Sequence, residues 1–286
     1  MSRTPTFSVI IPTYGRPRFL DAAIESVLAQ TVEDFELIVV DDASPQPVEV
    51  GDDRRISVVR RLENGGPAIA RNTGLVQARG RFVTFLDDDD LYTPERLQFA
   101  LEGLERAPVT VCERRGLDGT LPALERILEG DASDIILDDM TPHLGQVAIE
   151  RERAPRFDER FPALQDVEWW LRTASSMPLS TVSKLGHLYR AHGDQRHRNT
   201  VAERIRCSLL LLEIHPRYFE THSRARGFRW KRIGLMAQSI GDHALARAAF
   251  TRSLKSTVQP RTAWHLMKSL RSSQPPYNAS SRTESL

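Results

Sequence analysis

Four consecutive carboxylates, Asp87 to Asp90, follow the apolar run "RFVTFL". Neighbouring negative charges repel one another, so we expect such a cluster where a ligand requires the charge. In an extended segment, Asp87 and Asp89 would point to one side of the chain, and Asp88 and Asp90 to the other. Two carboxylates on one side suit Mg²⁺ or Mn²⁺, which completes its coordination shell with substrate phosphates and water. The cluster therefore predicts a metal-assisted site for a diphosphate ligand.

A purely structural role for the cluster is the alternative. Asp90 or Thr93 could cap the helix that the pattern "TPERLQFALEGL" predicts from Pro94 onward. Such a cap accounts for one side chain and leaves three carboxylates unexplained, so we favour the ligand site.

A second acidic pair, Asp41 and Asp42, follows the strand-like run "FELIVV". A carboxylate here could accept hydrogen bonds from a ribose or a pyrimidine-like base, although Asp is also an ordinary turn residue. The first strand is followed by "IPTYGRP", which lacks the glycine-rich dinucleotide fingerprint and the Walker lysine. A nicotinamide enzyme is therefore disfavoured.

The elements that must position these carboxylates alternate along the first hundred residues. Strand-like runs and helical periodicity form two successive βαβ units, with strands at 7–12, 35–40, 56–60 and 81–86 and helices at 19–28 and 65–80. This order predicts an α/β domain with a mixed, mostly parallel sheet covered by helices on both faces. Ligands bind such sheets beyond the carboxyl ends of the strands, where both acidic groups occur.

The charge of the chain is unevenly distributed. Residues 1–189 hold 21 Lys+Arg and 32 Asp+Glu, whereas residues 190–286 hold 18 and 6. A basic region could meet anionic lipid, a phosphate-bearing acceptor or nucleic acid, or could be the solvated face of helices. Because the aromatic and basic strand platform of an RNA-binding module is not evident, we expect no nucleic acid partner.

The compartment can be inferred from what the sequence lacks. No apolar run approaches the roughly 20 residues of a membrane span, and the N-terminus has no secretory signal pattern. Cys112 and Cys207 are too far apart for a zinc or disulfide motif. We therefore expect a cytoplasmic protein with reduced cysteines.

Several ordered motifs over residues 6–197 together resemble the family 2 glycosyltransferases, inverting enzymes with the GT-A nucleotide-sugar fold. The motifs are "FSVIIPTYGRPRFLDAAIESVLAQTVEDFELIVVDDAS", "NGGPAIARNTGL", "GRFVTFLDDDDLY", "FDERFPALQDVEWWLR" and "YRAHGDQ". The resemblance implies transfer of a sugar from a nucleoside-diphosphate sugar to an acceptor hydroxyl, with Mg²⁺ or Mn²⁺ as cofactor. The acceptor would be a cell-surface glycan, polysaccharide or glycolipid.

The resemblance also assigns roles to matching positions. Asp89 would bind the metal, with His192 as a second candidate, and Asp166 would be the catalytic base. The family's Glu-Asp pair reads Gln165-Asp166 here. The donor would be bound by Pro12, Thr13, Tyr14, Asp41, Asp42, Arg71, Asp87 and Asp88, and the acceptor sugar would stack on Trp169 or Trp170, one of which we expect in the core. The alternatives are a salt bridge for Arg71 and a helix cap for Asp166.

The resemblance, and the helical pattern that follows it, divide the chain into parts. We expect a GT-A domain at 1–200, with a nucleotide-sugar half at 1–112 and an acceptor half at 113–200. A basic helical extension at 201–272, with one tetratricopeptide-like hairpin turning at Gly241, and a disordered tail at 273–286 would follow. The basic extension could attach to the inner face of the membrane, where a lipid-linked acceptor would be presented.

Two other classes of function remain as alternatives. A sugar-nucleotide nucleotidyl or phosphoryl transferase would also use acidic metal ligands, but would carry a basic glycine-rich loop after the first strand. A non-catalytic scaffold would use the helical extension as its binding module. Loops 113–120 and 133–145 would decide donor and acceptor, which the sequence does not identify.

Overall fold

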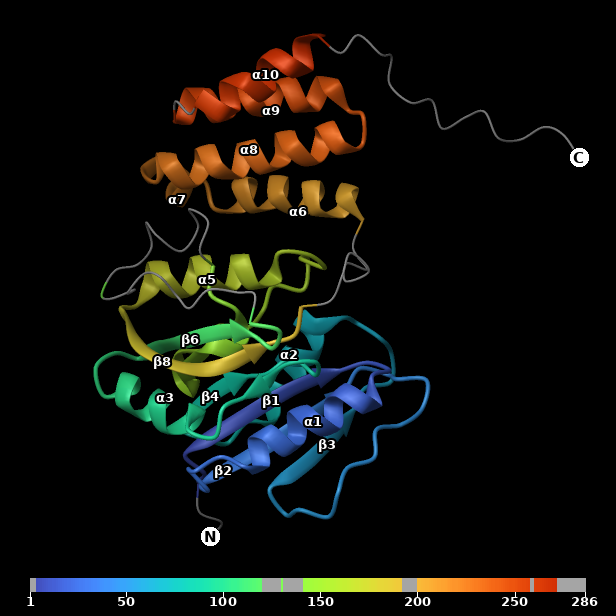
Figure 1. Cartoon of the computed structure of the whole chain (residues 1–286), viewed down its shortest axis with the longest axis vertical. Helices are drawn as coiled ribbons and strands as arrows, with labels where there is room; N and C mark the ends of the chain where they lie inside the picture. The colour runs from blue at the N-terminus through green and yellow to red at the C-terminus, as the bar shows by residue number, and fades with distance from the viewer. Residues whose placement is uncertain (1–3, 120–129, 131–140, 192–199, 258–259, 272–286) are drawn as a thin grey trace, which may run out of the picture. The chain divides into compact units, whose positions relative to one another are not determined.

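The computed structural model describes residues 4–119, 130, 141–191, 200–257 and 260–271, in two compact units, 1–196 and 197–286. The first unit is built on an eight-stranded sheet with strand order β3-β2-β1-β4-β7-β6-β8-β5 (Figure 1). The strands are β1 (Phe7–Thr13), β2 (Phe35–Asp41), β3 (Ile56–Arg60), β4 (Phe82–Phe85), β5 (Leu91–Tyr92), β6 (Val109–Gly116), β7 (Val147–Glu150) and β8 (Leu179–Tyr189). The helices and 3₁₀ turns are α1 (Pro17–Leu28), α2 (Pro67–Gln77), α3 (Arg96–Leu104), η1 (Leu144–Gln146), η2 (Arg151–Arg153) and α5 (Gln165–Ser176).

The sheet is mixed. Strands β3, β2, β1 and β4 are parallel, β7 runs antiparallel to β4 and β6, β8 is parallel to β6, and β5 is antiparallel to β8. The predicted mixed α/β sheet is confirmed. Strand β6 was not predicted, and part of it falls in the segment 113–120 that we interpreted as a loop.

Both faces of the parallel half are covered, as the apolar runs predict. Val9, Ile11 and Leu37 lie in one core cluster with the apolar faces of α1 and α3. Ile10, between Val9 and Ile11, packs on the opposite face, where α2 approaches it at Gly74. A Cβ on Gly74 would lie 2.4 Å from Ile10 Cγ2, so glycine is what lets this helix pack so closely.

Glu36 is a buried carboxylate near the amino end of β2. It lies at the opposite edge of the sheet from Asp41 and Asp42, which lie at the carboxyl end of this strand. It accepts hydrogen bonds from Ser8 Oγ at 2.6 Å, Arg79 N at 2.6 Å and Gly80 N at 3.2 Å. Burial opposes its ionisation, but these hydrogen bonds and the Arg79 charge together hold the pKa of Glu36 below its ordinary value. The ionised carboxylate therefore ties β1, β2 and the segment after α2 together.

We expect Glu36→Gln to lower the free energy of unfolding by about 1–3 kcal/mol at pH 7, because the amide nitrogen cannot accept these hydrogen bonds. A depressed folded-state pKa gives stability that is present above the unfolded-state value, about 4.3, and is lost as the pH falls through the folded value. Urea denaturation of both proteins at pH 7 and at acidic pH checks this. A wild-type advantage that does not shrink on acidification would contradict it, and the exposed Glu105→Gln is the control.

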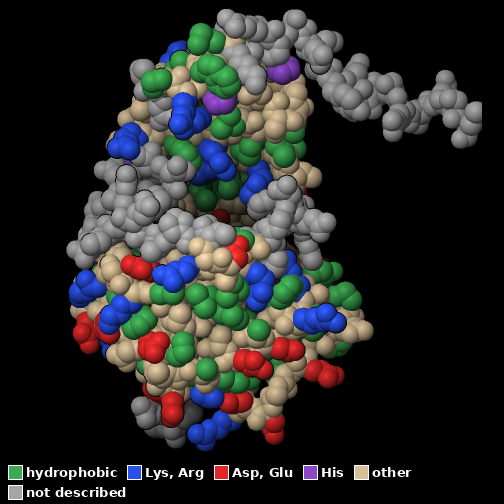
Figure 2. All heavy atoms as spheres, viewed as in Figure 1, with side chains coloured by type: hydrophobic (Ala, Val, Ile, Leu, Met, Phe, Trp, Pro, Cys, Tyr) green, Lys and Arg blue, Asp and Glu red, His purple; other side chains and the backbone are tan. Residues whose placement is uncertain are grey.

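The second unit is helical in its described residues. It contains α6 (Val201–Ile214), α7 (Pro216–Thr221), α8 (Ser223–Ser239), α9 (His243–Ser256) and α10 (Pro260–Arg271). Helices α8 and α9 are joined by a short turn in which Gly241 has φ 79°. Ala246, Ala249 and Phe250 are buried against Ile233 of α8. On the face shown in Figure 2, Lys and Arg side chains of this unit outnumber Asp and Glu.

Helices of membrane-spanning length and hydropathy are not found among the described residues. The tail expected at 273–286 lies outside the described residues.

Candidate active site

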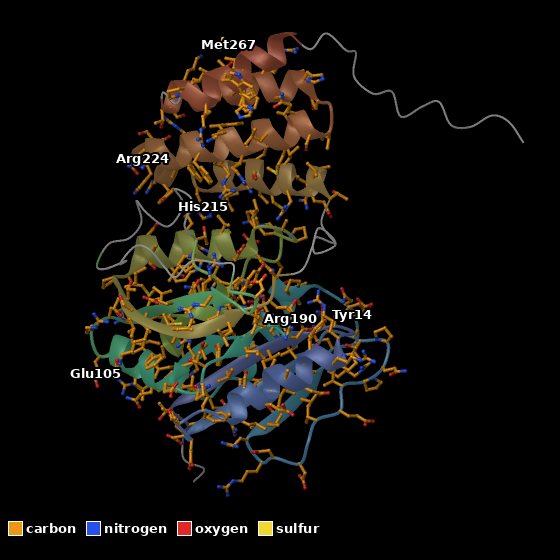
Figure 3. All side chains as sticks on the ribbon, viewed as in Figure 1. Tyr14, Glu105, Arg190, His215, Arg224 and Met267 are labelled. Atoms are coloured by element: carbon orange, nitrogen blue, oxygen red, sulfur yellow. The ribbon has the colours of Figure 1, made fainter. Side chains whose placement is uncertain are left out.

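The carboxyl ends of β1, β2 and β4 lie at one edge of the sheet, because these strands are parallel neighbours. Figure 3 labels Tyr14 and Arg190 at this edge and Glu105 at the opposite one. The predicted donor residues follow these strand ends. Pro12 and Thr13 are buried, and Tyr14 is half-buried.

Asp87 to Asp90 form a turn after β4. The Asp90 N–H donates to the Asp87 carbonyl at 3.1 Å. The turn gathers the carboxylate oxygens of Asp87, Asp89 and Asp90 within 4.8 Å of one another. The alternation that we predicted for an extended segment is therefore wrong, since Asp90 joins Asp87 and Asp89.

Arginines from other elements neutralise this turn. Arg71 of α2 is buried and its Nη2 donates to Asp87 Oδ1 at 2.5 Å. Arg16, before α1, donates from Nη1 to Asp89 Oδ2 at 2.7 Å and to Asp88 Oδ1 at 3.2 Å. Burial opposes the ionisation of Asp87, but Arg71 and nearby histidines lower its pKa to about 2. The turn thus combines carboxylates with cations that suit a phosphate.

Asp88 has a different environment from its neighbours. Its Oδ2 accepts a hydrogen bond from Thr13 Oγ1 at 2.7 Å, which joins the ends of β1 and β4. Burial raises the pKa of Asp88 to about 6, although Thr13 and Arg16 act in the opposite direction.

Asp90 is fully buried and pairs with His187 of β8, whose Nε2 is 3.0 Å from Asp90 Oδ2. The Arg190 N–H donates to Asp90 Oδ1 at 2.8 Å. Burial raises the pKa of Asp90 to about 7 and lowers that of His187 to about 3. Neither Asp90 nor Thr93 caps α3, which begins at Arg96 after a residue without a side-chain cap. The capping interpretation is therefore wrong, while Asp90 does have structural partners.

The oxygen-rich turn fits a hard divalent cation. Asp87, Asp89 and Asp90 offer carboxylate oxygens, which Mg²⁺ and Mn²⁺ prefer. Asp89 Oδ2 accepts a hydrogen bond from the Arg16 guanidinium at 2.7 Å. His192, the second predicted ligand, lies outside the described residues. His143 and His187 stand beside the turn, and neither was predicted from the sequence.

Hydrogen-bond donors of the protein itself occupy the carboxylates of Asp41 and Asp42. Asp41 is fully buried and accepts hydrogen bonds from Arg60, from the Ser44 N–H at 2.8 Å and from the Val48 N–H at 3.3 Å. Its predicted contact with the sugar donor is not supported, because the Asp41 side chain is fully buried and its hydrogen bonds hold the loop after β2.

Asp42 accepts hydrogen bonds from Arg61 and from the N–H groups of Gly65 and Gly66, at 3.1 Å and 2.7 Å. A ligand would have to displace Arg61 to reach this carboxylate. The two residues therefore have different structural roles. Asp41 supports the loop after β2, and Asp42 connects that loop to the start of α2.

Asp166 lies half-buried in the first turn of α5. The N-cap residue, Leu164, makes no side-chain cap hydrogen bond, and no cap by Asp166 is seen. Helix α5 is anchored to the end of β4 by an edge contact between Trp169 and Phe85, whose ring centroids are 6.1 Å apart. This contact ties the helix of the predicted base to the strand that precedes the acidic turn.

The predicted stacking of an acceptor sugar on Trp169 or Trp170 is not supported. Both indoles have 0% exposure. Their N–H groups donate to the Pro155 and Pro142 carbonyls at 2.8 and 2.7 Å. They are core residues that hold α5 in place.

Two non-glycine residues with positive φ occur among the described residues, Ala43 at 60° and Leu164 at 61°. Each left-handed residue costs roughly 1–2 kcal/mol. They stand beside Asp42 and two residues before Asp166, and such strain is concentrated at functional sites.

Comparison with known proteins gives consistent matches. Residues 8–128 match the family model described as "Glycosyl transferase family 2". The succinoglycan biosynthesis protein ExoW of Rhizobium meliloti is 46% identical over 108 residues, which are 35% of this chain and 34% of ExoW. The matched segment is therefore about a third of that relative's length.

Two solved structures share the fold. S. aureus TarS 1-349 in complex with UDP-GlcNAc superposes with a TM-score of 0.67 at 19% identity, over 92% of this chain and 84% of TarS 1-349. The mannosyltransferase PcManGT from Pyrobaculum calidifontis, in complex with GDP-Man and Mn²⁺, gives 0.56 at 18% identity, over 94% and 80%. The GT-A fold expected from the sequence is confirmed.

Proposed function

Because residues 8–128 match the model of glycosyltransferase family 2, we propose that this chain is a metal-dependent, inverting glycosyltransferase. It moves a sugar from a nucleoside-diphosphate sugar to an acceptor hydroxyl. The observation that carries the proposal is the turn after β4, where three carboxylates lie within 4.8 Å of one another and arginines from other elements surround them. Neither a nucleotidyl transferase nor a scaffold is favoured by an observation of comparable weight.

The donor's diphosphate is proposed to lie against the turn. Arg16 and Arg71 would exchange part of their contact with the carboxylates for contact with the phosphates. Pro12, Thr13 and Tyr14 would line the nucleobase side. A bound Mg²⁺ or Mn²⁺, held by Asp89 with Asp87 nearby, would neutralise charge on the departing diphosphate.

Asp166 is proposed to act as the general base. It would take the proton of the acceptor hydroxyl as that oxygen attacks the anomeric carbon, on the face opposite the diphosphate. The configuration at that carbon is then inverted. Gln165 replaces the acid of the family's pair, so no second carboxylate precedes the base.

The acceptor is proposed to be a growing cell-surface polysaccharide or glycolipid. The matched relative ExoW is named for succinoglycan biosynthesis, which supports a polysaccharide. We place the protein in the cytoplasm, in contact with the inner membrane surface.

The proposal is tested by thermal unfolding with a panel of nucleoside diphosphates and their sugars, with and without Mn²⁺. A ligand at about 100 times its Kd stabilises the folded state by about 2.7 kcal/mol, so binding is readily measured. We expect one nucleotide to stabilise the protein, and more so with Mn²⁺. NAD is the negative control. Stabilisation by NAD, or by none of the nucleotides, would remove the proposal.

Contact with the membrane is a separate prediction from the basic second unit. Arg206 of α6 and Arg232 of α8 are exposed. Each basic residue near an anionic surface contributes about 1 kcal/mol, so reversing both charges should weaken binding at least tenfold. Cosedimentation with phosphatidylglycerol vesicles at low salt measures this, with Arg54→Glu in the first unit as the control. Wild-type protein that stays in the supernatant would contradict the prediction.

A further inference from the structure

His143 and His187 form a stacked pair against the acidic turn. Their ring centroids are 4.9 Å apart and their planes differ by 12°. His187 is fully buried and paired with Asp90, whereas the His143 side chain is 20% exposed. Only His143 therefore combines a fixed ring with access to the site.

The position of His143 is fixed by the turn η1. The Gly145 N–H donates to His143 Nδ1 at 3.3 Å, and the His143 N–H donates to Gln146 Oε1 at 2.9 Å. Gln146 is itself held, since its Nε2 donates to the Cys112 carbonyl at 2.7 Å. A Cβ on Gly145 would lie 2.4 Å from His187 Nε2, so this close packing requires glycine.

The contacts of the ring determine what each nitrogen can do. Because Nδ1 accepts the Gly145 N–H, the neutral ring carries its proton on Nε2. That nitrogen faces Asp87 Oδ2 at 3.5 Å. Arg71 holds the other oxygen, Oδ1. Asp87 Oδ1 thus contacts Arg71 of α2, and Oδ2 lies near the ring of His143, the residue before η1.

We propose that His143 is a positioning residue for Asp87, and that its Nε2–H keeps Asp87 Oδ2 oriented toward the metal-bound donor. This inference rests on the proposed function. Direct ligation of the metal by His143 Nε2 would instead require the proton on Nε2 to move. The stack on His187 and the hydrogen bond from Gly145 keep the ring from turning away.

Three variants test separately the ring of His143 and the hydrogen bonds of its two nitrogens. His143→Phe keeps a ring on His187 and removes both nitrogens. His143→Asn keeps an acceptor for the Gly145 N–H and is too short to replace Nε2. His143→Gln places an amide N–H near the original Nε2.

The measurements are Mn²⁺ affinity by electron paramagnetic resonance, with and without the stabilising nucleoside diphosphate, and kcat and KM for the donor. Loss of a residue that orients the groups around a bound metal typically costs 10–100-fold in metal affinity. We expect a loss of that size in the Phe and Asn variants, and restored affinity in the Gln variant. Thermal unfolding shows whether each variant is folded.

Wild-type affinity in folded Phe and Asn variants would overturn the inference. A folded Gln variant as weak as the Asn variant would do so too, since the donor at Nε2 would then not matter. A wild-type protein that binds no nucleotide with Mn²⁺ would refute the proposed function, and the inference with it. A wild-type protein that binds and turns over a donor, with unaffected variants, refutes the inference alone.

Discussion

Asp166→Asn is expected to lower kcat for sugar transfer by about 10²–10⁴-fold, the usual contribution of general acid–base catalysis. The amide has the size of the carboxylate and cannot take the proton of the acceptor hydroxyl. Because the donor is proposed to bind through the strand ends and not through α5, KM for the donor and its effect on thermal unfolding should stay close to wild type.

The comparison variant is Asp21→Asn, an identical change on the exposed face of α1. It should have wild-type activity. Full activity in Asp166→Asn would assign the base to another residue, and a parallel loss of donor binding would show that Asp166 supports the donor instead.

Asp89→Asn is expected to weaken metal binding and, with it, the transfer step. Removing a preorganised group that stabilises charge in the transition state commonly costs about 10²–10³ in kcat, and a similar loss is expected here. The amide oxygen is a weaker ligand for Mn²⁺, and Arg16 loses its partner at 2.7 Å. Mn²⁺ affinity should fall together with the rate.

Titration of activity with Mn²⁺ distinguishes this from damage to the fold. The Asp89→Asn curve should move to higher Mn²⁺ concentrations, and thermal unfolding without ligand should stay near the wild-type temperature. An unchanged Mn²⁺ midpoint with a lowered rate would remove Asp89 as the main ligand. Asp21→Asn again serves as the matched control.

How much the sequence predicts depends on how local each feature is. The strands of the parallel half are apolar runs, and their boundaries follow from the residues themselves. The carboxylates that follow β2 and β4 are brought to one edge by this order alone. The acidic edge could therefore be predicted without any long-range information.

The histidines beside the acidic turn could not be predicted from local sequence. His187 reaches Asp90 because β5 pairs with β8, with Tyr92 opposite His187. His143 lies in a short turn before β7 and is close to both Asp90 and His187. These contacts join segments far apart in the chain, and a lone histidine on a strand carries no signal for its partner. The directions of the four Asp side chains were wrongly predicted, because the segment after β4 is a turn and not an extended segment.

Strand β6 and the two tryptophans show other limits. The charged residues Glu113, Arg114 and Arg115 obscure the apolar start of β6, although the strand continues through them beside β8 with register shifts. Trp169 and Trp170 were expected to divide between core and site. Both are buried because α5 meets Phe85 on one side and the Pro142 carbonyl on the other.

The most direct test of inverting, metal-dependent transfer is the configuration of the sugar first released from the stabilising donor, with water as acceptor, followed by proton NMR. With Mn²⁺ and an α-linked donor, the wild-type protein should release the β-sugar before mutarotation, and release should stop when the metal is chelated. Release of the α-sugar, or equal release without metal, would contradict the account.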